Sequence, residues 1–128
     1  MGKYLITGIT GFVGPHLVDL LVREGHCVCG LIRCSNGAET SILDTITIDV
    51  FNEIEFIYGD LLFRDRIDFI INSYKFDGIF HLAAQSHPPT SFNAPRDTFE
   101  VNAVGTVNLV DSVLRRQPDC KFMNCSTS

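Results

Sequence analysis

The segment from Thr7 to Gly14, which reads TGITGFVG, holds the strongest chemical signal in the sequence. Its glycines recur at every third position between a short apolar run and an amphipathic stretch. In such a turn we expect Gly8 to lead the chain away from a strand, Gly11 to let the backbone approach a pyrophosphate, and Gly14 to allow close helix–sheet packing. Because the first amides of a helix lack partners within the helix, they and the helix dipole would hold the phosphates. The alternative is a glycine-rich turn that binds nothing, but its place after the first apolar run favours phosphate binding.

A second signal lies at the end of the next apolar run, which reads Leu31-Ile32-Arg33. Sites that prefer NAD usually place an Asp or Glu there, which accepts a hydrogen bond from the ribose 2′-hydroxyl. Arginine cannot accept that bond, but it pairs well with a 2′-phosphate. The sequence therefore favours NADP, with NAD as the alternative. An exposed arginine at a strand end with no ligand is the simpler interpretation.

Short apolar runs alternate along the chain with amphipathic stretches, and this pattern must position both signals. It predicts strands over 3–7, 26–32, 54–58, 78–82 and 121–125, and helices over 14–24, 64–75 and 95–116. Alternating strands and helices indicate a parallel sheet covered on both faces. Right-handed crossovers then favour an α/β, Rossmann-type doubly wound sheet with the strand order 3-2-1-4-5.

The pattern supports two further interpretations. The stretch 34–51 is interpreted as a loop, because it shows no clear periodicity. For the helix over 95–116, the apolar spacing predicts an inward face made of Phe99, Val107, Val110, Val113 and Leu114.

Composition excludes several classes of protein. The chain has 128 residues, a formal net charge of −5, 45% hydrophobic residues and 20% charged residues. This is the composition of one globular domain, or one lobe of a larger one, and it argues against a nucleic-acid partner, which needs a basic face. No apolar run approaches the roughly 20 residues that span a bilayer, and no secretory signal is present, so we expect no membrane partner and a cytoplasmic protein.

The five cysteines form no framework of regular spacing, which indicates reduced thiols. Cys27 and Cys29 are interpreted as small buried strand residues rather than metal ligands, and we expect no metal site.

Five segments, taken together and in this order, resemble the extended short-chain dehydrogenase/reductase superfamily, also described as the NAD-dependent epimerase/dehydratase family. They are the glycine segment Thr7–Gly14, Gly59-Asp60-Leu61, His81-Leu82-Ala83-Ala84-Gln85-Ser86, Asn102-x-x-Gly105-Thr106 and Cys125-Ser126-Thr127-Ser128. Within the superfamily, Ala84-Gln85-Ser86-His87 and Ser126-Thr127-Ser128 look most like GDP-mannose 4,6-dehydratases.

The resemblance implies a lyase of nucleotide-sugar metabolism that converts GDP-mannose to GDP-4-keto-6-deoxy-mannose. In this reaction NADP takes a hydride from the sugar C4, water leaves across C5 and C6, and the hydride returns to C6. The family's Tyr-x-x-x-Lys pair lies beyond the fifth strand, so residues 1–128 are expected to form an incomplete NAD(P)-binding Rossmann domain, truncated after that strand. The substrate-binding lobe would be absent, and the chain would be inactive alone. The alternatives are a nucleotide-sugar epimerase or 4-keto reductase of the same superfamily, or a non-catalytic NADP-binding module.

The resemblance also assigns residues. Thr127 would be catalytic, orienting the C4 oxygen, and Ser86 would contact the sugar of the nucleotide-sugar substrate. The cofactor contacts would come from Gly8, Thr10, Gly11, Phe12, Val13, Gly14, Arg33, Asp60, Leu61, Leu82, Ala83, Ala84, Gln85 and Asn102. His16, His26 and His81 are interpreted as packing or surface residues, and the parent enzyme is expected to be a homo-oligomer.

Overall fold

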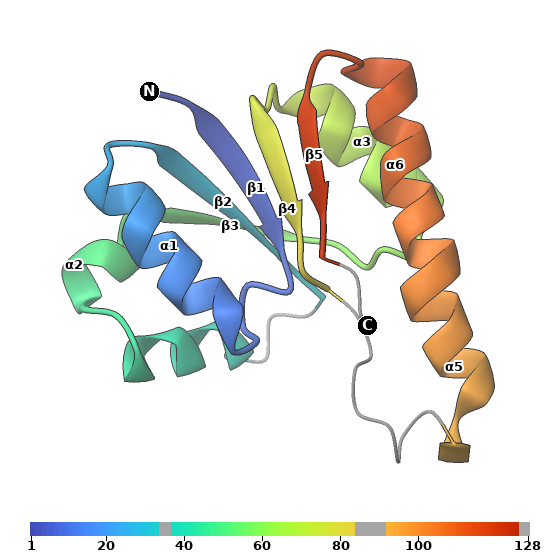
Figure 1. Ribbon diagram of the computed structural model, residues 1–128, viewed down its shortest axis with the longest axis horizontal. Helices are drawn as coiled ribbons and strands as arrows, with labels where there is room; N and C mark the ends of the chain where they lie inside the picture. Colours follow the sequence, from blue (N-terminus) through green and yellow to red (C-terminus); the bar gives the residue numbers. More distant parts are fainter. Residues whose placement is uncertain (34–36, 84–91, 126–128) are drawn as a thin grey trace.

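The computed structural model describes residues 1–33, 37–83 and 92–125. These residues form one parallel sheet of five strands in the order β3-β2-β1-β4-β5, which confirms the predicted topology (Figure 1). The strands are β1 (Lys3–Thr7), β2 (Cys27–Ile32), β3 (Ile54–Tyr58), β4 (Gly78–His81) and β5 (Lys121–Asn124). Because all five strands are parallel, their carboxyl ends lie at one edge of the sheet, where ligands bind in open α/β folds.

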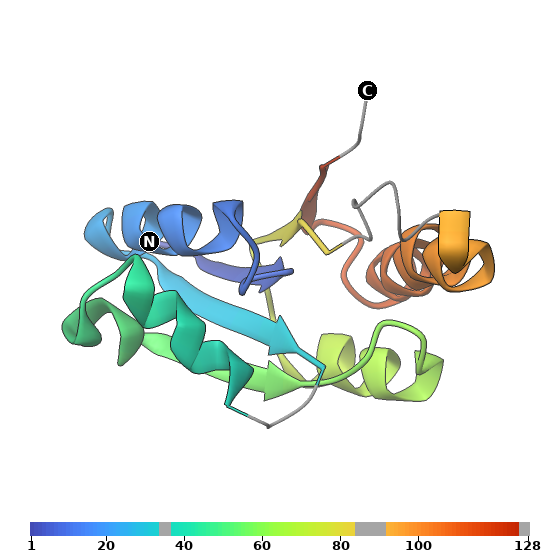
Figure 2. The same cartoon turned by 90° about the horizontal axis from the view of Figure 1, so that it is seen from below.

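Helices cover both faces of the sheet (Figures 1 and 2). One face carries α1 (Val13–Arg23), the 3-10 helix η1 (Ala38–Asp44) and α2 (Ile48–Phe51). The other face carries α3 (Arg64–Ser73) and α6 (Gly105–Arg116). Helix α6 continues directly from α5 (Pro95–Phe99) through the π-helical turn η2 (Glu100–Val104).

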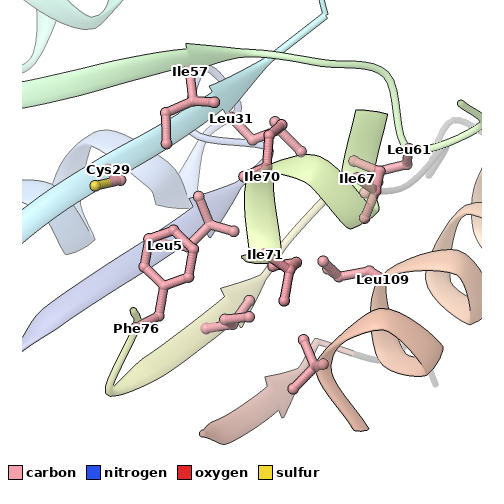
Figure 3. Packing of buried hydrophobic residues seen from close by; sticks show 12 residues of the cluster. Leu5, Cys29, Leu31, Ile57, Leu61, Ile67, Ile70, Ile71, Phe76 and Leu109 are labelled. Atoms are coloured by element: carbon pink, nitrogen blue, oxygen red, sulfur yellow. The ribbon is translucent and has the colours of Figure 1, made fainter. Parts of the chain in front are cut away.

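Side chains of the central strands alternate between two apolar cores. Leu5 of β1 lies beneath α3 and α6, in the same core cluster as Ile70 and Leu109 (Figure 3). Its neighbour Ile6 points to the opposite core, beneath α1. A shift of β1 by one residue would exchange these faces, so burial fixes its register and with it the position of the turn that follows.

Between β2 and β3 the structure differs from the predicted loop. Ile42 of η1 and Ile46 are buried in the core beneath α1, and Thr47 caps α2 by accepting a hydrogen bond from the Val50 amide. Val50 and Phe51 of α2 pack against the same core, but these four apolar residues are divided between two short helices and produce no continuous helical period in the sequence.

The predicted inward face of the helix over 95–116 was wrong in part. Phe99, Val107 and Leu114 are 65%, 62% and 66% exposed, whereas Val113 is buried as predicted and Val110 is half-buried. The buried face instead consists of Gly105, Leu109, Ser112 and Val113. A π-helical turn shifts the angular phase of the residues after it, and the small side chains of Gly105 and Ser112 carry no apolar signal.

The two cysteines of β2 differ in exposure. Cys29 lies in the core beneath α3, as expected, and burial raises the pKa of its thiol to about 11. Cys27, the first residue of the strand, is exposed, so the expectation of burial was wrong for this residue.

Among the helices of the described residues, none combines the length and apolarity that crossing a bilayer requires.

Candidate functional site

The glycine turn leaves the carboxyl end of β1 and enters α1 within a few residues. Gly8 has a φ of +69°, and its carbonyl accepts a hydrogen bond of 3.0 Å from the Gly11 amide. The residues at the crest of the turn, Thr10, Gly11 and Phe12, are exposed. The turn therefore exposes its backbone at the edge of the sheet, together with the Phe12 side chain, which is 87% exposed.

Gly8 also lies against the chain that follows β4. A Cβ atom at Gly8 would be 2.7 Å from the Ala83 amide nitrogen and 2.8 Å from the Leu82 carbonyl carbon. Only glycine allows both the positive φ and this approach. The turn after β1 and the segment after β4 thus form one continuous wall.

The third glycine has a different role from the helix–sheet packing expected of it. A Cβ atom on Gly14 would lie 2.2 Å from the Ile9 carbonyl oxygen, so its contact is with the turn itself. Ile9 is fully buried, and its side chain occupies the space that a Cβ on Gly30 of β2 would need. Gly14 and Gly30 together hold the turn down onto the sheet.

Helix α1 begins directly after the turn, with Phe12 at its N-cap position. Within the described part of the chain, no side chain makes a capping hydrogen bond there, and the first turn holds no acidic residue. The first amides of a helix need partners from outside the helix. The start of α1 is therefore suited to an anion.

Two further predicted residues lie at the same edge of the sheet. Arg33 follows β2 and is exposed. The next strand is tied to this point, because the Gly59 amide donates to the Ile32 carbonyl across 2.9 Å. Asp60 follows, and its Oδ1 accepts a hydrogen bond of 3.0 Å from the Leu62 amide. This contact makes Asp60 a turn residue.

Leu61 belongs to the loop after β3, and its side chain is buried against the start of α6. The Asn108 side-chain amide donates to the Leu61 carbonyl across 2.8 Å. A Cβ on Gly105 would lie 3.1 Å from the Leu61 Cβ, so a small residue is needed there. Sequence reasoning missed Asn108, although it follows the quoted Asn102-x-x-Gly105-Thr106 segment by only two residues.

The chain beyond β4 remains bonded to β1. The Leu82 amide donates to the Thr7 carbonyl and the Ala83 amide donates to the Thr7 hydroxyl, each across 3.1 Å. Thr7 is buried and immediately precedes Gly8. Its hydroxyl therefore connects the two halves of the wall described above.

His81, the last residue of β4, is a buried polar residue rather than a surface one. Its Nδ1 lies 2.6 Å from the Thr7 hydroxyl and its Nε2 lies 2.8 Å from the Thr106 hydroxyl of α6. The Thr106 hydroxyl in turn donates to the Asn102 carbonyl across 2.8 Å. Burial lowers the pKa of the His81 imidazole, which favours its neutral form. A histidine at the end of an apolar strand gave no signal of these contacts in the sequence.

The structure gathers most of the predicted cofactor residues at the carboxyl edge of the sheet. They are Gly8, Thr10, Gly11, Phe12, Val13, Gly14, Arg33, Asp60, Leu61, Leu82, Ala83 and, through Thr106 and His81, Asn102. Ala84, Gln85, Ser86 and Thr127 lie outside the described residues.

A parallel sheet of this order, with a three-glycine turn entering an uncapped helix, defines a Rossmann-type nucleotide-binding fold of the short-chain dehydrogenase/reductase class. Within that class the chain belongs to the GDP-mannose 4,6-dehydratase family, because the family model described as "GDP-mannose 4,6 dehydratase" matches residues 5–128.

Similar proteins extend well beyond the residues of this chain. It is 37% identical to GDP-mannose 4,6 dehydratase 2 of Caenorhabditis elegans, covering 97% of this chain and 34% of that protein. It is 39% identical to the GDP-mannose 4,6-dehydratase of Yersinia enterocolitica, covering 100% of this chain and 36% of that protein. The chain thus spans about a third of the length of the curated relatives that it matches.

Solved structures of the same class are also similar. The UDP-Glc/GlcNAc 4-epimerase of Campylobacter jejuni superimposes with a TM-score of 0.84 at 29% identity, covering 100% of this chain and 38% of the epimerase. The Thermus thermophilus UDP-glucose 4-epimerase, solved as a complex with NAD, gives a TM-score of 0.74 at 25% identity, covering 89% and 34%.

Proposed function

We propose that this chain forms the NADP-binding portion of a nucleotide-sugar 4,6-dehydratase that acts on GDP-mannose. Membership of the GDP-mannose 4,6-dehydratase family supports the reaction class. The single observation that carries the binding function is the wall made by Gly8 and Ala83 beside the uncapped start of α1. That arrangement supplies backbone amides without partners inside the helix, which suit a diphosphate.

The residues of the turn fit such a group. Among the described residues, a Cβ atom on Gly11 would meet only the Gly8 carbonyl oxygen, at 3.3 Å, so no described residue covers the outer side of the turn. The amides at the start of α1 would bind the diphosphate, and the Asp60–Leu61 segment would bind the adenosine half. When bound, the nicotinamide would supply the hydride acceptor for oxidation at the sugar C4.

We assign NADP rather than NAD on the strength of Arg33. The NAD complex of the Thermus thermophilus epimerase supports a nicotinamide dinucleotide in this fold, without deciding between the two. Arg33 is exposed at the end of β2, where the adenosine ribose would lie, and its guanidinium would pair with a 2′-phosphate.

The substrate-side assignments rest on the family. Thr127 would hold the C4 oxygen of the sugar, Ser86 would contact the sugar, and Ala84 and Gln85 would follow the nicotinamide ribose. A tyrosine–lysine pair supplied elsewhere in the enzyme would remove the C4 hydroxyl proton.

A nucleotide-sugar 4-epimerase is the second candidate, favoured by the similarity to the Campylobacter jejuni epimerase. The reaction products distinguish the two. A dehydratase loses water and yields a 4-keto-6-deoxy sugar, whereas a 4-epimerase returns a sugar of unchanged mass.

Isothermal titration of the purified protein with NADP and with NAD tests the binding function. We expect both to bind, NADP about tenfold more tightly, which corresponds to one charge-assisted contact. Absence of heat with either dinucleotide would reject the binding function, and tighter binding of NAD would reject the assignment of Arg33.

A further inference from the structure

We propose that His81 is a positioning residue for the dinucleotide site, and that its neutral imidazole holds the glycine turn in the conformation that binds. The inference rests on the proposed function in one respect, that the site takes a dinucleotide. The hydrogen-bond arrangement that carries it stands on the structure alone.

The direction of each hydrogen bond follows from its neighbours. The Thr106 hydroxyl donates its proton to the Asn102 carbonyl, so its oxygen can only accept from His81 Nε2, which must carry a hydrogen. In a neutral ring Nδ1 is then an acceptor, and the Thr7 hydroxyl donates to it across 2.6 Å. The Thr7 oxygen in turn accepts from the Ala83 amide.

Each hydrogen bond of this relay therefore has only one possible donor. The relay begins with the Ala83 amide as a donor and ends with the Asn102 carbonyl as an acceptor. Thr7 directly precedes Gly8, and Ala83 is the residue on which Gly8 closes. The His81 ring thus holds both sides of the wall, and it ties them to the junction of η2 and α6.

The surroundings of the ring give it no charged partner among the described residues. Burial is the only cause that lowers its pKa. From β5, the Phe122 ring lies with its centroid 5.9 Å away, and the exposed Cys125 contributes its amide to the His81 carbonyl. From β1 and α6 the facing groups are the Thr7 and Thr106 hydroxyls.

Protonation would break the relay. A hydrogen on Nδ1 would face the Thr7 hydroxyl hydrogen, so Thr7 would have to rotate and leave that hydrogen without its acceptor. A buried polar group without a partner is unfavourable, and the loosened turn would bind a dinucleotide less tightly. The affinity for NADP should therefore fall on acidification because His81 becomes protonated, and not only because the phosphates of NADP titrate.

The test measures NADP affinity at about pH 7.5 and about pH 4.5, and the lower value lies well below the ordinary histidine pKa because burial lowers the pKa of His81. The variants are His81→Asn, which keeps an acceptor near Nδ1 but does not titrate, and His81→Phe, which keeps the ring without its nitrogens. At the higher pH we expect His81→Phe to bind about tenfold more weakly than wild type and His81→Asn to recover part of that loss.

The decisive quantity is the ratio of the two affinities for each protein, because titration of the NADP phosphates affects all variants equally. We expect a steeper acid loss for wild type than for His81→Asn. His26→Asn, at the opposite edge of the sheet, serves as a control that keeps the wild-type profile. Equal profiles for wild type and His81→Asn would overturn the proposal.

A second readout needs neither dinucleotide nor substitution. Long-range ¹H–¹⁵N spectra of the wild-type imidazoles report the tautomer, and we expect His81 to carry its hydrogen on Nε2 at about pH 7.5. An Nδ1–H tautomer would overturn the inference even if NADP binds. If wild type fails to bind NADP while the Nε2–H tautomer is found, the proposed function fails and the relay stands.

Discussion

A Cβ atom placed on Gly8 would lie 2.7 Å from the amide nitrogen of Ala83, although the two residues are far apart in the sequence. The contact joins the turn after β1 to the chain after β4, at the point where the diphosphate would bind. Neither segment can move away from the other without breaking the hydrogen bonds that Thr7 accepts from Leu82 and Ala83.

Gly8→Ala should therefore destabilise the protein more than a positive φ alone explains. Gly25→Ala is the matched control, because Gly25 has a φ of +85° and an added Cβ would meet no atom of residues 1–33, 37–83 and 92–125 within 4 Å. We expect Gly25→Ala to cost about 1 kcal/mol of unfolding free energy, and Gly8→Ala at least about 2 kcal/mol, because its Cβ meets backbone. Urea denaturation measures both free energies. Equal losses would show that the turn after β1 and the segment after β4 move apart at little energetic cost.

Arg33→Asp should reverse the dinucleotide preference. The variant removes the partner of a 2′-phosphate and supplies an acceptor for a 2′-hydroxyl, so NADP affinity should fall at least about tenfold while NAD affinity holds or rises. Arg23→Asp, at the far end of α1, makes the same change of charge away from the site. An equal fall for both dinucleotides in Arg33→Asp would count against the ribose contact.

Asn108→Leu should affect stability and binding together. The substitution keeps the size of the side chain but leaves the Leu61 carbonyl without its donor, at a cost of about 1–2 kcal/mol in unfolding free energy. Because Leu61 lies in the proposed adenosine site, NADP affinity should fall a few-fold. Asn72→Leu, at an exposed position of α3, is the control. If Asn108→Leu is destabilised but binds NADP with unchanged affinity, the loop that holds Leu61 does not contribute to NADP binding.

The sheet could be predicted because its signals are local and redundant. The apolar runs of β1 to β4 are short and bounded, and Gly25 marks the end of α1 with the positive φ expected of a residue after a helix. The segment of η1 and α2 could not be predicted, since Ile42 and Ile46 are placed by contacts with α1 rather than by local periodicity.

The candidate site likewise has features that the sequence predicts and features that it does not. The glycine spacing and Arg33 were visible in the sequence because each proposed contact would be made by one backbone segment, or by one residue at one strand end. The contacts of His81 were not, since Thr7 and Thr106 reach it from two other elements. The exposure of Val107 also escaped prediction, because the phase of α6 depends on a π-helical turn.

The chain alone should not convert GDP-mannose. None of its tyrosines, Tyr4, Tyr58 and Tyr74, is followed four residues later by lysine, so it lacks the acid–base pair that the family uses. Loss of such a unit lowers turnover by orders of magnitude. Mass spectrometry of GDP-mannose incubated with the 128-residue chain and NADP should detect no loss of water. Formation of the 4-keto-6-deoxy product, by a preparation shown to bind NADP, would contradict this.

Acid should weaken the contact between α3 and α6 through Asp68. Its pKa is lowered by the nearby Ser112 hydroxyl, which makes no hydrogen bond among the described residues, and by Arg115, whose guanidinium lies 2.7 Å from its carboxylate. Because the folded pKa lies below the unfolded value of about 4, the unfolded chain binds more protons in this range. The stability that Asp68 contributes is therefore complete above about pH 4 and is lost as the pH falls through the folded pKa. Asp68→Asn should be less stable than wild type at neutral pH, with a difference that shrinks on acidification. Urea midpoints across that range, with Asp44→Asn as the charge-matched control, measure the effect, and a constant difference would assign it to packing rather than to charge.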